Sequence, residues 1–328
     1  MRAVQLREFG AASLLYVGSA DVPVPKAGEV LLRVKATAVN RADCMQRQGK
    51  YPPPKGESEI LGLEAAGVVE QPAGAWKVGD RVIALLQGGG YAEQVAVPAP
   101  LCMPLPEGMS FVDGACIPEA WLTAFQHLHF TAGVEAKDSV LVHAGASGVG
   151  TAAIQLAKMA GAKVVATAGS DEKCNFCTKY GADVVLNYKT LGGKFGTEVR
   201  EATEGKGVSI ILDCVGASYF SENAKAAAVD CRWINYAFLG GSQLPDGTDL
   251  RWLFGKRVNL HFSTLRSRSL AYRESLVSSF ASKALPGFLD GRLRVVLDSK
   301  MPLDEVQKAH ERMESNENKG KIVLTVEE

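Results

Sequence analysis

Hydrophobic and polar residues alternate along several short stretches near the start of the chain. In residues 29–35, Val30, Leu32 and Val34 fall on one face, which predicts a half-buried strand. Similar signals predict strands at the N-terminus and over residues 61–70, 78–85 and 91–97. Between the last two lie three glycines, and we expect a tight hairpin turn there rather than a phosphate loop, because no helix follows. Short strands at this spacing predict a compact, β-barrel-like domain.

The pattern changes near Pro118, where residues 118–128 take on helical periodicity. From there short apolar runs alternate with helical stretches. This alternation predicts an α/β domain with a doubly wound parallel sheet, of the Rossmann type. The six predicted strands are residues 140–142, 163–167, 183–186, 208–213, 231–236 and 258–262.

The last segment does not fit the count of this parallel sheet. It predicts a helix, a strand, a helix and a closing strand, and we expect it to pack back on the first domain. These four elements are residues 271–280, 293–297, 303–315 and 320–326. We therefore place a β-rich catalytic domain at residues 1–119 and 267–328, and a dinucleotide-binding domain at residues 120–266.

Composition narrows the range of partners. The 328 residues are enough for two cores, and 36 basic residues balance 36 acidic ones. Zero net charge gives no support to nucleic acid or an anionic membrane as the main partner. No run of about eighteen apolar residues spans a bilayer, and residues 1–8 lack the apolar core of a signal peptide. We expect a cytoplasmic protein.

The seven cysteines are scattered and odd in number, so reduced thiols are expected. Cys174 and Cys177 form a C-x-x-C pair inside a helix predicted over residues 172–180. Zinc sites of this type usually need a second pair, and none follows. We interpret the two as ordinary helix residues rather than as a redox or metal pair.

Residues 139–150 carry the strongest chemical signal. A buried strand is followed by Gly145, Gly148 and Gly150, and then by a helix over residues 151–160 that Gly161 is suited to end. This arrangement seats a dinucleotide pyrophosphate on a helix N-terminus, although a tight turn without a ligand has the same pattern. Ser147 resembles a hydrolase nucleophile only superficially, because its surroundings are not G-x-S-x-G.

The end of the second parallel strand indicates which cofactor is bound. NAD-preferring sites usually carry an acidic residue there for the ribose hydroxyls, but this chain has Ala168 and Gly169. Ser170 and Lys173 suit a 2′-phosphate. Asp171 is interpreted as the cap of a helix that starts near residue 172. We predict NADPH rather than NADH.

Taken together, these residues resemble the zinc-free quinone oxidoreductase branch of the medium-chain dehydrogenase/reductase superfamily. The resemblance covers essentially the full length. It is carried by residues 40–43, 46–51, 62–64, 117–124, 143–150, 186–188, 212–216 and 320–324.

The resemblance implies a homodimeric, NADPH-dependent two-electron reductase of quinones, joined through the edge strand at residues 258–262. It places Tyr51 and Asn40 on the substrate side, with Asn40 also near the nicotinamide. Ser147, Gly148 and Val149 match the pyrophosphate loop. The full set of implied cofactor residues is Asn40, Gly145, Ser147, Gly148, Val149, Gly150, Gly169, Ser170, Lys173, Tyr188, Cys214, Val215, Phe238 and Leu239.

Alcohol dehydrogenases of this superfamily hold zinc with Cys and His where this chain has Asn40 and Leu63. Leu63 cannot ligate a metal and Asn40 is a poor zinc ligand, so we expect no catalytic metal. Without a Lewis acid, reduction of an electron-poor quinone is favoured over alcohol oxidation.

Several alternatives stay open. Tyr51 beside the stiff Pro52–Pro54 loop either contacts the quinone or is an ordinary surface tyrosine, and Asn40 is either a buried structural amide or a nicotinamide contact. His143 is given no catalytic role. Reduction of α,β-unsaturated carbonyls is a second possible activity, although it needs a proton donor and only Tyr51 is in view. A third hypothesis is that the protein has no enzymatic activity and is an NADPH-binding redox sensor, structural protein or RNA-binding protein.

Overall fold

The computed structural model describes residues 1–326 and divides the chain into two units. One unit comprises Met1–Leu122 with Arg266–Glu328, and the other comprises Thr123–Leu265. The domain boundaries predicted from sequence lie at residues 119/120 and 266/267. The first falls within a helix and the second within a turn. Each unit has its own sheet and its own core, so each is described separately.

The first unit is built on a seven-stranded sheet centred on β3 (Glu29–Val39). Along β3, the side chains of Val30, Leu32 and Val34 are buried as the alternation predicts, but Leu31 on the other face is buried too, so the strand is more than half-buried. The sheet runs in the order β14-β15-β3-β4-β5-β7, and β6 also pairs with β3. The remaining strands of this sheet are β4 (Glu64–Gln71), β5 (Arg81–Leu85), β6 (Gln94–Pro98), β7 (Cys102–Pro104), β14 (Leu297–Pro302) and β15 (Lys321–Thr325).

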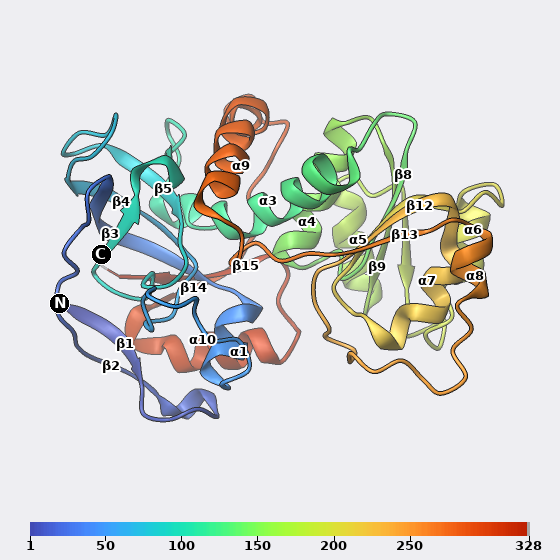
Figure 1. The fold of residues 1–328 in the computed structure, drawn as a ribbon, viewed down its shortest axis with the longest axis horizontal. Helices are drawn as coiled ribbons and strands as arrows, with labels where there is room; N and C mark the ends of the chain where they lie inside the picture. The colour runs from blue at the N-terminus through green and yellow to red at the C-terminus, as the bar shows by residue number, and fades with distance from the viewer. Residues whose placement is uncertain (327–328) are drawn as a thin grey trace. The chain divides into compact units, whose positions relative to one another are not determined.

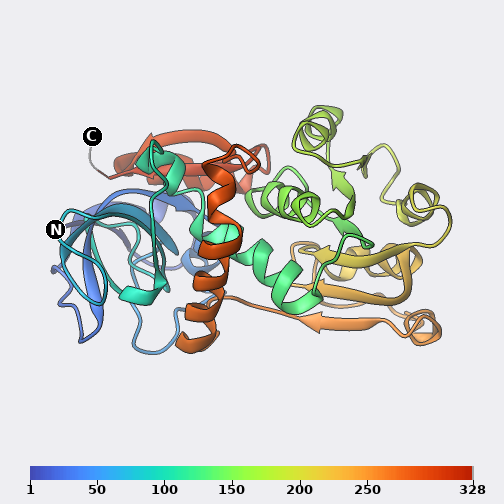
Figure 2. The ribbon, with the colours of Figure 1, turned by 90° about the horizontal axis from the view of Figure 1, so that it is seen from above.

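The C-terminal tail completes this sheet, as predicted. Strand β15 pairs antiparallel with β3, from Ile322 opposite Val39 to Thr325 opposite Ala36. Figure 2 shows the red C-terminal strands lying against the blue N-terminal ones. The first unit also contains a hairpin of β1 (Arg2–Leu6) and β2 (Leu15–Ser19), and the helical elements η1 (Ala12–Leu14), α1 (Arg41–Arg47), η2 (Ala99–Leu101), α2 (Phe111–Gly114), α9 (Leu270–Lys283), η5 (Leu285–Phe288), η6 (Leu303–Glu305) and α10 (Val306–Glu314).

Two sequence-based predictions in this unit are wrong. The glycines at 88–90 do not form a tight hairpin, because β5 pairs with β4 and β7 while β6 pairs with β3. The glycine segment instead packs against residues 60–62, where the Gly90 amide donates to the Gly62 carbonyl at 3.1 Å. The strand predicted over 293–297 begins only at Leu297. Leu293 and Val296 are buried, and only Val296 reaches β15, where its carbonyl accepts from the Lys321 amide at 2.8 Å.

The second unit has a six-stranded, fully parallel sheet in the order β10-β9-β8-β11-β12-β13, so the predicted Rossmann sheet is confirmed. Figure 1 shows the strands beside the helices that connect them. The strands are β8 (Ser139–Val142), β9 (Lys163–Ala168), β10 (Val184–Asn187), β11 (Val208–Asp213), β12 (Ala227–Asn235) and β13 (Asn259–Phe262). The helices are α4 (Gly148–Met159), α5 (Asp171–Lys179), α6 (Gly196–Ala202), η4 (Ala217–Tyr219), α7 (Phe220–Ala226) and α8 (Arg251–Gly255).

The helix predicted over residues 118–128 is partly right. Helix α3 (Pro118–Phe125) is followed directly by a π-helical turn, η3 (Gln126–Ala132). Gly133, in the left-handed conformation with φ of 61°, ends that turn. The boundary between the two units falls inside α3, so this helix belongs to both.

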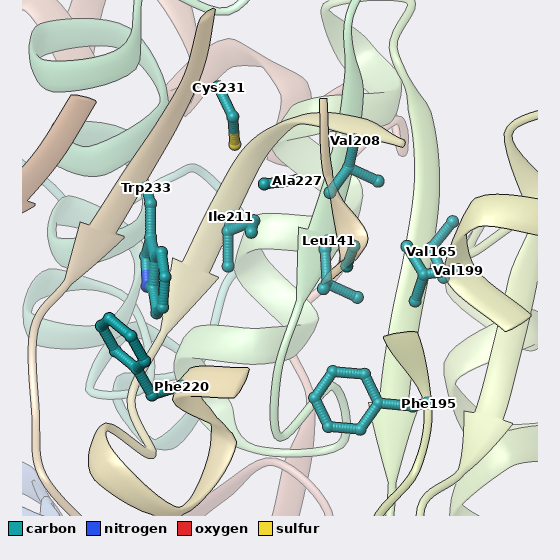
Figure 3. Close-up of a cluster of buried hydrophobic side chains, with 11 residues drawn as sticks. Leu141, Val165, Phe195, Val199, Val208, Ile211, Phe220, Ala227, Cys231 and Trp233 are labelled. Carbon is teal, nitrogen blue, oxygen red and sulfur yellow. The ribbon is translucent and has the colours of Figure 1, made fainter. Parts of the chain in front are cut away.

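An apolar cluster holds the second unit together. Trp233 on β12 packs on Phe220 of α7, with ring centroids 5.2 Å apart, and Phe195 lies near Leu141 and Val165 of the neighbouring strands (Figure 3). These strands are nearly continuous apolar runs because helices cover both faces of a parallel sheet. Replacing a side chain of this size with Ala typically lowers the free energy of unfolding by about 3–5 kcal/mol.

All seven cysteines are free within the described part of the chain, and Cys174 and Cys177 lie on α5. Cys177 is buried, and burial raises its thiol pKa to about 12, which makes it unreactive. No helix among residues 1–326 is long and apolar enough to cross a membrane.

Buried His310 on α10 makes the stability of the first unit depend on pH. Its Nε2 lies 3.3 Å from the Tyr91 hydroxyl, and its Nδ1 lies 3.4 Å from Nη1 of Arg47. Burial, reinforced by the Arg47 charge, lowers its pKa to about 3. Below the unfolded pKa of about 6.5, the unfolded chain therefore binds a proton that the folded one does not, and stability falls as the pH falls.

We expect this histidine to remove about 2 kcal/mol of unfolding free energy between pH 7 and pH 5. His310→Gln should lose less stability over that interval than the wild type, as measured by urea unfolding at each pH. Burial raises the pKa of neighbouring Asp43 to about 6. This shift makes the protein more stable as the pH falls, but it does so equally in the wild type and in His310→Gln. His261→Gln, at an exposed histidine, is the control. Equal slopes for wild type and His310→Gln would contradict this account.

Candidate functional site

In the second unit, the sequence-predicted cofactor residues all follow the carboxyl ends of adjacent parallel strands. Residues 145–150 follow β8, residues 169–173 follow β9, and Tyr188 follows β10. Cys214 and Val215 follow β11, and Phe238 and Leu239 follow β12. Connections leave the sheet in opposite directions between β8 and β11, which is where ligands bind in open α/β sheets.

The N-terminus of α4 presents unpaired backbone donors. Ser147 caps this helix, and its Oγ accepts from the Gly150 amide at 3.0 Å. The amides of Gly148 and Val149 have no acceptor among residues 1–326. Two unpaired N–H groups at the positive end of a 12-residue helix can bind an anion such as a phosphate.

The glycines of this loop are needed chiefly for packing. A Cβ on Gly150 would lie 2.3 Å from the Ala144 carbonyl oxygen. A Cβ on Gly145 would lie 2.9 Å from Sγ of Cys177 and 3.0 Å from Cβ of Ala166. These approaches let α4 start immediately after the turn. The glycine spacing that suggests a nucleotide site thus has a local structural reason, and the unpaired amides carry the binding argument.

Beyond β9, the site has no carboxylate at the strand tip. Ser170 caps α5, with its Oγ accepting from the Lys173 amide at 3.2 Å. Asp171 is therefore not the cap that the sequence suggested; its carboxylate instead accepts from Asn187 Nδ2 at 2.7 Å. The Tyr188 ring stands over Gly169, where a Cβ would lie 2.9 Å from the Tyr188 hydroxyl.

A buried carboxylate fixes the loop after β11. Asp213 accepts from the Val215 amide at 2.7 Å and the Gly216 amide at 3.0 Å, and also from Asn223 Nδ2 and Trp233 Nε1. Asn223 in turn contacts Nε2 of His143 at 2.7 Å. The polar side-chain groups named in this series of hydrogen bonds, from Asp213 through Asn223 to His143, all find partners within the protein.

His143 is therefore structural. Its second nitrogen lies 2.9 Å from the Thr167 hydroxyl, and its side chain is fully buried. Burial lowers its pKa, so the ring is neutral. This agrees with the absence of a catalytic role in the sequence-based prediction.

The loop after β12 presents apolar side chains. The Leu239 amide donates to the Cys214 carbonyl at 3.1 Å, and the Gly240 amide donates to the Val215 carbonyl at 2.7 Å. Phe238 and Leu239 are half-exposed, at 50% and 51%. The two strand-end loops are thus tied together by their backbones and leave an aromatic and an aliphatic side chain accessible.

In the first unit, Asn40 lies in a buried ionic cluster. Its Nδ2 donates to Glu64 Oε1 at 2.8 Å, and its Oδ1 accepts from Lys321 Nζ at 2.6 Å. Lys321 also donates to Glu64 at 2.7 Å, and both side chains are almost completely inaccessible to solvent. The Asn40 amide is thus engaged by its neighbours in this unit, which fixes its orientation.

Tyr51 is half-buried beside Arg266, whose guanidinium carbon lies 5.5 Å from the centre of the tyrosine ring. Burial raises the pKa of the Tyr51 hydroxyl, and the negative charge of Glu119 raises it further. Tyr51 is therefore a neutral phenol with a charged arginine on its ring and an acid close by.

Glu119 is the residue that the sequence-based search missed. Its amide donates to Glu64 Oε2 at 2.8 Å, but its carboxyl group makes no hydrogen bond or ion pair with any residue in 1–326. Burial, together with the charge of Glu64, raises its pKa to about 8. Glu119 lies in the block 117–124 that carries the family resemblance, but one glutamate in a helix gives no sign that it will be half-buried without a hydrogen-bond partner for its carboxyl.

The donor set does not suit a catalytic metal. No group of three or more His, Cys, Asp or Glu side chains in the described part of the chain could hold one. Leu63 is buried and has no ligating atom, and Asn40 is already bonded to Glu64 and Lys321.

Known proteins with the same two-part organisation match this chain. Residues 26–107 match the family described as "Alcohol dehydrogenase GroES-like domain", and residues 148–282 match "Zinc-binding dehydrogenase". Human quinone oxidoreductase is 31% identical over 330 residues, which cover 99% of this chain and 97% of that protein.

Solved structures of similar proteins share the fold over nearly the whole chain. Escherichia coli quinone oxidoreductase complexed with NADPH has a TM-score of 0.89 at 26% identity, and covers 99% of this chain and 100% of its own. The CurK enoyl reductase has a TM-score of 0.86 at 26% identity, with 99% and 98% covered. Because human quinone oxidoreductase is 31% identical over nearly the full length of both proteins, and family models match segments of both units, the chain belongs to the quinone oxidoreductase branch of the medium-chain dehydrogenase/reductase superfamily.

Proposed function

We propose that this protein is an NADPH-dependent oxidoreductase that transfers a hydride to quinones without a metal. The observation that carries the proposal is the pair of unpaired amides, Gly148 and Val149, at the switch point of the parallel sheet. Around them the strand ends bring together the residues assigned to the cofactor from sequence. The full-length similarity to quinone oxidoreductases, one of them complexed with NADPH, supports the same conclusion.

The residues present fit NADPH. The amides after Ser147 would hold the pyrophosphate, and Tyr188 above Gly169 would face the adenosine. Ser170 and Lys173 at the start of α5 would contact the 2′-phosphate, with no carboxylate on the tip of β9 to repel it. Bound NADPH would supply the hydride.

On the nicotinamide side, the fixed loops after β11 and β12 would support the ring through Cys214, Val215, Phe238 and Leu239. Their backbone hydrogen bonds to each other make this surface rigid. In the first unit, Asn40 is oriented for a nicotinamide-side or substrate-side contact, and Tyr51 would stack on or hydrogen-bond to the quinone. Rigid positioning of two rings is the main requirement of hydride transfer to a delocalised acceptor.

Without a metal, the acceptor must already be electron-poor. The donor set at Asn40 and Leu63 offers no Lewis acid to hold an alkoxide. A quinone fits, because the charge formed on reduction spreads over its ring. Residues 45–49, 118–125 and 265–268 resemble the tumour-suppressor-inducible quinone oxidoreductase of animals, and this resemblance favours quinones as the substrate class.

Reduction of α,β-unsaturated carbonyls is the second candidate. The similarity to an enoyl reductase favours it, and Glu119 is a second acid besides Tyr51 that could provide the required proton. A non-enzymatic NADPH-binding sensor or RNA-binding protein is the third candidate, and zero net charge speaks against RNA. We also propose a cytoplasmic homodimer joined through β13, an edge strand with an exposed Phe262.

Comparing acceptors tests the reaction. With saturating NADPH, we expect kcat/KM for 1,2-naphthoquinone to exceed that for a simple enone by about tenfold or more. Initial rates of NADPH oxidation measure both. A tenfold preference for the enone would instead favour reduction of α,β-unsaturated carbonyls as the function. NADPH binding without turnover on a panel of quinones would favour the third.

Ser147→Asp tests the phosphate loop. Aspartate is as good a helix cap as serine, so α4 should stay folded, but its charge would repel the pyrophosphate. We expect the Kd for NADPH, measured by fluorescence quenching, to rise by about 100-fold or more. Ser269→Asp changes the cap of α9 in the other unit and is the matched control. Unchanged NADPH binding by Ser147→Asp would show that the loop is only a turn.

Ser170→Asp tests the choice of cofactor. It keeps a capping residue on α5 and places an acid beside the tip of β9, where NAD-preferring sites carry one. The wild type should bind NADPH about tenfold or more tightly than NADH, and the variant should lose or reverse that preference. Titration with both cofactors measures it. Equal affinity of the wild type for NADPH and NADH would refute the roles of Ser170 and Lys173.

A further inference from the structure

Arg266 carries a buried donor that the protein does not satisfy. Its Nε and Nη2 both donate to the Gln87 carbonyl, at 2.8 and 2.5 Å, and Gln87 Nε2 donates back to the Arg266 carbonyl at 2.8 Å. Its third nitrogen, Nη1, is buried and has no partner among the described residues. The whole residue is only 5% exposed. A buried guanidinium with an unpaired N–H is unfavourable unless something else accepts that hydrogen bond.

The surroundings indicate what that acceptor is. The Arg266 guanidinium lies over the ring of Tyr51, the residue assigned to the substrate side. The carboxyl of Glu119 makes no hydrogen bond, and its negative charge acts to raise the pKa of both Tyr51 and Arg266. The first unit therefore combines an aromatic ring under a guanidinium, a buried cationic donor without a partner, and a carboxyl group coupled to both by charge. Together they suit a flat ligand with an oxygen that becomes negative and then takes up a proton.

We propose that Arg266 and Glu119 complete the reduction of the acceptor: Nη1 of Arg266 stabilises the oxygen that becomes negative, and the Glu119 carboxyl gives that oxygen its proton. This inference rests on the proposed function and deepens it. The sequence assigned no role to Arg266, and Glu119 answers the need for a proton donor that Tyr51 alone left open.

The reaction balances with these groups. Bound NADPH would supply a hydride, that is, one hydrogen with its electron pair. Its transfer to the quinone forms one O–H bond and places the negative charge on the other oxygen, which gives a hydroquinone monoanion. The O–H bond of Glu119 then breaks and a second O–H bond forms on the anion, giving the neutral hydroquinone. A proton taken up from the solvent restores the Glu119 carboxyl. The sum is quinone, NADPH and one proton converted to hydroquinone and NADP⁺.

The charges around Glu119 keep it protonated at neutral pH. Burial raises its pKa to about 8, and the carboxylates of Glu64 and Asp43 add to the rise. Lys321 and Arg266 act in the opposite direction but do not cancel the effect of burial. Burial and the charge of Glu119 raise the pKa of the Tyr51 phenol, so Tyr51 is neutral as well. A carboxylic acid that titrates near the working pH is suited to give up its proton and recover it in each turnover.

Arg266→Met tests the oxyanion role, with Arg268→Met as the matched control because Arg268 stacks on Tyr272 in the same segment. We expect Arg266→Met to lower kcat/KM for 1,2-naphthoquinone by about 100-fold. The Kd for NADPH should change less than about twofold in both variants, since the proposed nucleotide residues lie in the other unit. Because Met also removes the hydrogen bonds to Gln87, Arg266→Lys serves as the conservative variant and should recover part of the lost activity.

Glu119→Gln tests the proton donor through a pH profile. The wild-type kcat should fall as the pH rises through about 8, since the required acid loses its proton. Glu119→Gln should have a kcat about tenfold or more below the wild type at pH 7 and no such fall at higher pH. A variant that keeps both the wild-type kcat and the alkaline fall would overturn the role of Glu119.

A binding measurement separates this inference from the reaction itself. 4-Nitrophenolate, a flat oxyanion that resembles the hydroquinone anion, should bind the wild type in the presence of NADP⁺ about tenfold or more tightly than Arg266→Met. If the wild type reduces no quinone, the proposed function fails, yet this binding difference still supports Arg266 as an oxyanion donor. Equal nitrophenolate binding and equal quinone kinetics in wild type and Arg266→Met would overturn the inference.

Discussion

The first unit depends on one buried ion pair, Glu64 with Lys321. A carboxylate removed from water must be paired and hydrogen-bonded, and Glu64 achieves this with Lys321, Asn40 and the Glu119 amide. These partners come from distant parts of the chain. The pair therefore holds the C-terminal strand β15 in the sheet, orients Asn40 ahead of α1 and fixes the start of α3. Removing either charge would leave the other buried and unpaired, which typically costs about 3–5 kcal/mol.

The second unit also contains a buried carboxylate, that of Asp213, which must be hydrogen-bonded. Its carboxylate is saturated by two backbone amides, an asparagine and a tryptophan, and it fixes the loop after β11. In both units the fully bonded groups form a rigid support. Among the groups without a partner in residues 1–326 are the amides of Gly148 and Val149, Nη1 of Arg266 and the carboxyl of Glu119. Other buried atoms, such as Gln46 Oε1 and Asn235 Oδ1, also lack partners. The candidate functional groups are therefore distinguished by unused hydrogen-bonding capacity together with their place at a helix N-terminus or beside Tyr51.

The difference between fully bonded and unpaired groups also bears on the proposed metal-free reduction. A fold shared with metal-dependent dehydrogenases has Leu63 and a fully engaged Asn40 at positions where a metal would need ligands. Positioning and charge stabilisation must then come from side chains. Arg266 supplies a fixed positive charge, and Glu119 supplies a proton whose loss is made difficult by burial. Reduction of an acceptor that delocalises its charge, as proposed above, needs no Lewis acid, whereas oxidation of an alcohol does.

The sequence by itself determined the parallel sheet of the second unit, because short apolar strands, glycine turns and amphipathic helices follow one another locally. It also indicated the glycine turn at residues 145–150 and the missing acid after the second parallel strand, while the assignment of Tyr188 and of residues 214–239 to the cofactor came from the family resemblance. Only the tertiary structure decided that β6 pairs with β3, and that Asn40 is saturated while Arg266 and Glu119 are not. Pairing and burial depend on contacts between residues far apart in the chain, and no local pattern records whether a charged side chain will find all its partners.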